Sequence, residues 1–106
     1  MKNFRTYNLA KEVYLKVKHI DLPSHEKDQL SRASLSIALN LAEGYGRMTS
    51  KDKKRFFSIA FASLRECQAI MELSEIKEQE LNLQFNQLGA MIYQLMKKMK
   101  FYRIGI

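Results

Sequence analysis

The sequence contains few residues that interrupt helices and lacks the cysteine pairs that cross-link small folds. Among 106 residues there are one proline, four glycines, no tryptophan and one cysteine, Cys67. The scarcity of proline and glycine, together with abundant leucine, lysine, glutamate, methionine and alanine, favours an all-α fold. A lone cysteine can form no intramolecular disulfide and has no partners at zinc-site spacing, so Cys67 is expected to be a small buried residue.

Long apolar runs are also missing. The N-terminal residues lack the apolar run of a signal peptide, and no segment approaches the roughly 20 apolar residues of a transmembrane helix. We therefore expect a cytoplasmic protein with no membrane partner. With 46% hydrophobic residues the chain can bury a modest core, and its length predicts a single domain over residues 1–106.

Apolar residues recur at spacings of three and four and predict four helices. These are expected from about Asn8 to Ile20, from Ser24 to Gly44, from about Lys51 to Lys77, and across the apolar positions from Leu81 to Tyr102. Ser24 and the pair Thr49-Ser50 are expected as N-caps. Since the connections are short and the last two apolar seams are heptad-like, we predict an antiparallel up-down-up-down four-helix bundle. Gly89 falls inside the fourth helix, where either close helix approach or no special role is possible.

Ten consecutive uncharged residues, Ala33 to Ala42, stand out in a chain of net charge +7. On a helix this stretch is apolar nearly all round, apart from a narrow polar stripe. A surface helix of a monomeric bundle should instead have a wide polar face. We therefore expect another subunit to cover the outward side of the second helix.

The polar stripe needs hydrogen-bonding partners if it is covered. Arg65 and Glu66 of the third helix are the expected partners. The predicted network comprises Arg32, Ser36, Asn40, Glu43, Arg65 and Glu66. It is interpreted as a structural network that fixes helix register or subunit pairing. An active site is the less favoured alternative, because basic residues accompany the carboxylates and no histidine or nucleophile joins them. No catalytic residue, metal site or cofactor is expected.

Positive charge is concentrated in two short segments. Residues 47–55 (RMTSKDKKR) and residues 97–103 (KKMKFYR) each carry a net charge of +4, so the rest of the chain is close to neutral. The basic residues are Arg47, Lys51, Lys53, Lys54, Arg55, Lys97, Lys98, Lys100 and Arg103. In an up-down-up-down bundle both segments should lie at one end, together with the N-terminus, while acidic residues gather at the other end.

This clustering favours binding to nucleic acid. Cations near the N-terminus of the third helix oppose its dipole, so helix stabilisation does not explain them. Phosphate binding does, although a charged rim that only aids solubility is the alternative. Tyr45, between two glycines, is a candidate for stacking on an unpaired base or for a subunit contact. No sequence-reading motif is present.

The segment from Gln29 to Arg47 (QLSRASLSIALNLAEGYGR), followed by Phe56, Ile59-Ala60 and Ser63-Leu64-Arg65-Glu66, resembles a known bacterial family. These are the four-helix bundle proteins encoded in intervening sequences of 23S rRNA genes, related to the accessory variability proteins of diversity-generating retroelements. This sequence departs from the family pattern at Ser31, where a second basic residue is usual, and at Ala38-Leu39, which replaces a common proline-containing pair.

The resemblance implies a homopentamer without catalytic activity, a role in binding nucleic acid and, in the retroelement branch, a reverse transcriptase partner. The sequence thus predicts a non-enzymatic, oligomeric accessory protein that binds the backbone of RNA or DNA. The alternative is a protein-interaction scaffold that recruits a partner such as a reverse transcriptase or another polymerase.

Overall fold

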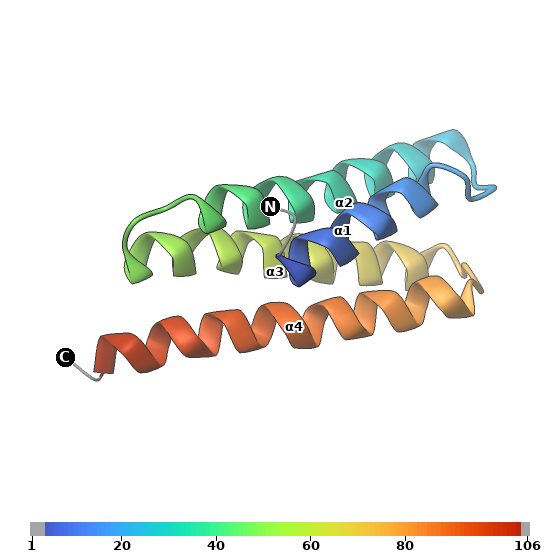
Figure 1. The fold of residues 1–106 in the computed structure, drawn as a ribbon. Coiled ribbons are helices and arrows are strands. Elements are labelled where there is room, and N and C mark those ends of the chain that lie inside the picture. Colours follow the sequence, from blue (N-terminus) through green and yellow to red (C-terminus); the bar gives the residue numbers. More distant parts are fainter. Residues whose placement is uncertain (1–3, 105–106) are drawn as a thin grey trace.

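The computed structural model describes the backbone of residues 4–104 and the side chains of residues 4–99. Its elements are α1 (Arg5–Val17), α2 (Ser24–Tyr45), α3 (Ser50–Leu73) and α4 (Gln79–Ile104). Consecutive helices run antiparallel and pack on one another, and α4 packs on α1 to close the ring (Figure 1). The predicted all-α, antiparallel four-helix bundle is confirmed. No helix in the described part of the chain is long and apolar enough to cross a membrane.

Helix α1 is much shorter than its neighbours. Its 13 residues span about 20 Å, whereas the 24 residues of α3 span about 36 Å at 1.5 Å per residue. Figure 1 shows α1 beginning part-way along the bundle, while the C-terminal end of α4 and the α2–α3 connection lie at the same end of the molecule. Arg5, the first residue of α1, therefore lies back from that end, and the predicted position of the N-terminal residues 1–3 falls outside the described part of the chain.

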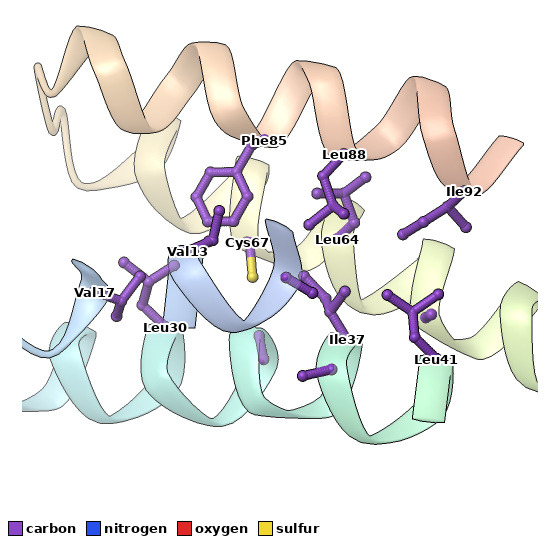
Figure 2. Packing of buried hydrophobic residues seen from close by; sticks show 14 of the residues in the cluster. Val13, Val17, Leu30, Ile37, Leu41, Leu64, Cys67, Phe85, Leu88 and Ile92 are labelled. Carbon is purple, nitrogen blue, oxygen red and sulfur yellow. The ribbon is translucent and has the colours of Figure 1, made fainter. Parts of the chain in front are cut away.

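The core contains the apolar positions that the helical spacing predicted. Figure 2 shows side chains from all four helices meeting between them, among them Val13, Leu30, Leu64 and Phe85. Cys67 is fully buried, as predicted. The fourth-helix seam is buried through Ile92, after which Leu95 and Met99 are partly buried against the core. Tyr102, also predicted to lie in this seam, falls outside the described side chains.

Two of the predicted helices have different bounds in the structure. The first helix covers Arg5–Val17 rather than Asn8–Ile20. Ile20 is buried, but it lies in the following turn, where its N–H donates to the Val17 carbonyl at 3.3 Å. The apolar spacing therefore extends past the end of the helix, because a residue of the turn is also buried in the core. The third helix ends at Leu73 instead of Lys77, because Glu75 adopts a left-handed conformation with φ of 55°.

The predicted N-caps have different outcomes. Thr49 caps α3 as expected, and its hydroxyl accepts a hydrogen bond from the Asp52 N–H at 3.1 Å. Ser24 is instead the first helical residue of α2, and Pro23 occupies the cap position without a side-chain bond. The fixed φ of proline, here −53° with ψ of 144°, holds the extended conformation that precedes a helix.

Two glycines allow helices to approach closely. A Cβ on Gly44 would lie 2.6 Å from Cε1 of Phe57, and a Cβ on Gly89 would lie 2.8 Å from Cδ2 of Leu64. Both distances are shorter than carbon atoms tolerate. Gly44 thus sets the α2–α3 spacing near their connection, and for Gly89 the close-approach alternative is the one supported.

Candidate nucleic-acid interface

Five cations at one end of the bundle make no hydrogen bond or ion pair with any residue that the structure describes. They come from the start of α3 and from α4 near its C-terminal end, which lie at the same end of the molecule (Figure 1). They are Lys51, Lys54, Arg55, Lys97 and Lys98, and all except the half-buried Lys54 are exposed. We call these five residues the basic end. The side chains of Lys100 and Arg103, on the next turns of α4, lie outside the described residues.

Lys53, by contrast, is engaged within the protein. Its Nζ donates hydrogen bonds to the carbonyl oxygens of Tyr45 at 3.0 Å and Gly44 at 3.3 Å. The last carbonyls of a helix lack intrahelical partners, and a cation is favourable there. Lys53 therefore caps α2 from the first turn of α3. Sequence reasoning missed this role, because a lysine eight residues beyond a helix end has no recognised capping pattern.

Arg47 is also held in place. Its Nη2 donates to Oε2 of Glu43 at 2.6 Å, and its guanidinium lies 4.5 Å from the centre of the Phe56 ring. Arg55 contacts the same ring at 5.2 Å but makes no hydrogen bond within the described residues. Two guanidinium groups thus pack on the Phe56 ring. With respect to the described residues, the N–H donors of Arg55 remain free to bind a ligand, whereas Arg47 is paired with Glu43.

An aromatic stack lies beside these cations. The rings of Tyr45 and Phe4 are stacked at a centroid distance of 4.9 Å and an interplanar angle of 25°. Phe4 is buried against the core, whereas 48% of Tyr45 is exposed. Lys53 Nζ lies 6.0 Å from the Tyr45 ring centre. The involvement of Phe4 was not foreseen, because it precedes the predicted first helix.

Acidic residues gather near the opposite end, at the α1–α2 and α3–α4 connections. They are Asp21, Glu26, Asp28, Glu72, Glu75, Glu78 and Glu80. Lys16 of α1 forms an ion pair with Glu80 and donates to Gln84 at 2.9 Å, which joins α1 to α4. The two ends therefore differ in sign, as the charge pattern predicted.

Part of the predicted polar stripe joins α2 to α3. The hydroxyls of Ser36 and Ser63 are 2.8 Å apart, and Nδ2 of Asn40 donates to the carbonyl oxygen of Ser36 at 2.9 Å. Nδ2 of Asn40 also lies 3.2 Å from the Ser36 hydroxyl. Ser63 was missing from the predicted set, although a small polar residue on the facing helix is the expected partner for a serine.

The other members of the stripe lie apart from this cluster. Glu43 pairs with Arg47. Nη1 of Arg65 donates to Oε1 of Gln68 on the same helix, α3, and Nε2 of Gln68 donates to Oδ1 of Asn86 on α4. Within the described part of the chain, the exposed Arg32 and Glu66 make no hydrogen bond or ion pair. The six residues therefore do not form one network within a single protomer. Their role in subunit pairing stays a prediction.

Apolar side chains are exposed beside the serine pair. Leu35 is 37%, Leu39 58% and Ile59 40% exposed. Because α2 and α3 are antiparallel and Ser36 contacts Ser63, Leu39 and Ile59 lie one turn further in the same direction. The outward side of the α2–α3 pair is thus partly apolar, as the uncharged stretch predicted. We call Leu35, Leu39 and Ile59 the apolar face.

The reactive side chains of the described chain include Cys67 and residues of the metal-ligating types. Burial raises the pKa of the Cys67 thiol to about 12, so the thiolate nucleophile is almost absent at neutral pH. No three His, Cys, Asp or Glu side chains come together as possible metal ligands among the described residues.

Comparison with known proteins assigns the chain to a family. No curated protein and no solved structure matches the sequence. A family model described as 23S rRNA-intervening sequence protein matches residues 3–100, which include all of α1, α2 and α3 and most of α4. The chain therefore belongs to the 23S rRNA-intervening sequence protein family.

Proposed function

We propose that this protein is a non-enzymatic, oligomeric accessory protein whose basic end binds the phosphate backbone of RNA or DNA. The observation that carries the proposal is the gathering, at one end of the bundle, of five cations that make no hydrogen bond or ion pair with the described residues. Arg47, Lys53, Lys100 and Arg103 add positive charge to the same region. Phosphate contacts release condensed counterions, so such a surface binds polyanions without reading sequence.

Oligomerisation supports the same function. We propose that the apolar face packs against a second copy of the chain and that the assembly is a homopentamer. Several basic ends in one assembly would increase affinity for a long polyanion, because the second contact becomes intramolecular. Substituting Leu39→Glu places a charge in this face and should lower the mass measured by light scattering. An unchanged mass would contradict self-association through this face.

The alternative function is a scaffold that recruits a protein partner, such as the reverse transcriptase of a diversity-generating retroelement or another polymerase. The exposed Leu35, Leu39 and Ile59 favour it, because they could pack on a partner as well as on a second copy. An apolar interface should depend weakly on salt, whereas phosphate binding should weaken steeply.

A charge-matched pair of variants tests nucleic-acid binding. The first variant replaces Lys51, Lys54 and Arg55 with alanine, and the control replaces Lys11, Lys27 and Lys77. Both lose three positive charges, and none of these six side chains makes a hydrogen bond or ion pair in the described structure. Affinity for labelled single-stranded RNA, measured by fluorescence anisotropy at low salt, should fall in the first variant and change little in the control. Equal affinities would assign binding to net charge alone and contradict the proposed interface.

A further inference from the structure

We propose that the basic end prefers single-stranded nucleic acid and stacks one unpaired base on the exposed part of the Tyr45 ring. This inference rests on the proposed function, since phosphate contacts bring the strand to the surface. It adds a preference that charge alone does not provide. The ligand is an unpaired nucleobase within a strand.

The Tyr45 ring is fixed before any ligand arrives. Phe4 stacks against it at 4.9 Å, and Phe4 in turn lies 6.3 Å from Phe57, whose ring is buried in the core. Stacking on a ring that is already held loses little side-chain freedom. Because 48% of Tyr45 remains exposed, a base can reach the ring beside the Lys53 ammonium that lies over it.

A fixed positive charge lies next to this ring. Lys53 Nζ is 6.0 Å from the ring centre and is anchored by the carbonyl oxygens of Tyr45 and Gly44. An ammonium makes three hydrogen bonds, so two carbonyl contacts leave one donor for a phosphate next to the stacked base. Lys54 and Arg55, on the same turn of α3, can contact further phosphates along the strand.

The same geometry disfavours duplexes. Inside a double helix both faces of each base are covered by neighbouring base pairs, so only the two end pairs offer a face to the Tyr45 ring. The phosphates remain accessible, and the duplex should bind through charge alone. Stacking on an aromatic ring contributes roughly 1–3 kcal/mol per base in single-stranded complexes.

Four protein forms and three ligands test the inference. The proteins are the wild type, Tyr45→Leu, Tyr45→Phe and Tyr14→Leu. Tyr14 is the matched control, because it also lies beside a lysine, with Lys18 Nζ 4.8 Å from its ring, but on α1. The ligands are labelled oligothymidylate, a strand of abasic nucleotides with the same number of phosphates, and a duplex of equal length. Affinity is measured by fluorescence anisotropy at constant salt, with thermal unfolding as the folding check.

Tyr45→Leu should weaken thymidylate binding at least about fivefold and leave abasic-strand and duplex binding unchanged. Tyr45→Phe should retain the wild-type preference, and Tyr14→Leu should behave as the wild type. An equal loss on base-bearing and abasic strands, or no loss at all, would overturn the inference while leaving phosphate binding intact. A change in oligomer mass in Tyr45→Leu without loss of the thymidylate preference would overturn it in favour of a subunit contact. Failure of the wild type to bind any ligand at low salt would overturn the proposed function as well.

Discussion

The ammonium of Lys53 lies 3.0 Å from the main-chain carbonyl oxygen of Tyr45, so a side chain of α3 caps the C-terminal end of α2. Within residues 47–55, Lys53 therefore stabilises the fold, whereas its neighbour Lys54 makes no hydrogen bond with the described residues and can bind a ligand. Lys53→Ala should lower the free energy of unfolding by about 0.5–1 kcal/mol, in the range of helix-end cation effects. Lys54→Ala is the neighbouring control and should change stability little, because Lys54 makes no such bond. Urea denaturation measures both, and equal stabilities would contradict the cap.

Gly44 and Gly46 should respond oppositely to alanine. A Cβ at Gly44 would lie 2.6 Å from the buried Phe57 ring, so Gly44→Ala should destabilise the fold by about 1–3 kcal/mol. A Cβ at Gly46 meets only backbone oxygens, the nearest at 3.7 Å, and the φ of −84° suits alanine. Gly46→Ala should therefore stabilise by up to about 1 kcal/mol. Thermal or urea unfolding of the two variants tests this, and a stabilising Gly44→Ala would contradict the close approach of α2 and α3.

At position 75, glycine should make the fold more stable than the natural glutamate does. It has φ of 55°, and the following N–H of Ile76 donates to the Met71 carbonyl at 3.0 Å, which closes a Schellman motif. Side chains disfavour this left-handed conformation, so Glu75→Gly should stabilise the protein by about 0.5–1 kcal/mol. Glu78→Gly, in the following connection, provides a comparison without left-handed φ. A destabilised Glu75→Gly would show that the α3 end is built differently.

Cys67 should report on unfolding. Its pKa is raised from 9.0 to about 12 by burial, with a smaller effect of the nearby Glu66 charge. Since the folded state holds the proton more tightly, this group contributes stability below pH 9.0 that is lost as the pH rises toward 12. At pH 8 a thiol reagent should modify Cys67 only as fast as the protein opens, and urea should accelerate the reaction. Rapid labelling of the native protein would contradict its burial.

The fold was predictable because its signals are local and repeated. The spacing of Val13 and Val17, or of Leu81, Phe85 and Leu88, allows only one apolar face on a helix. The ends were less predictable, since Ile20 continues the apolar period within a turn and Glu75 ends α3 in a conformation that its residue type does not indicate. Helix termini depend on backbone geometry more than on periodicity.

The candidate interface was predictable as a region and less so in its details. Two lysine-rich segments indicated one charged end, since helix order alone places them together. Composition could not show either contact. The bond from Lys53 to the Tyr45 carbonyl depends on how the short connection places α3 against the end of α2, and the stack of Phe4 on Tyr45 joins positions distant in sequence. For the same reason Ser63 was not foreseen as the partner of Ser36.

The salt dependence of nucleic-acid affinity tests the central claim most directly. The logarithm of the binding constant for single-stranded RNA should fall linearly with the logarithm of salt concentration, by about 0.7 per phosphate contacted. Replacing Lys51, Lys54 and Arg55 with alanine should flatten that slope by about 2 units if each neutralises one phosphate, while the Lys11, Lys27 and Lys77 control keeps the wild-type slope. Identical slopes in all three proteins would contradict the basic end as a phosphate-binding surface.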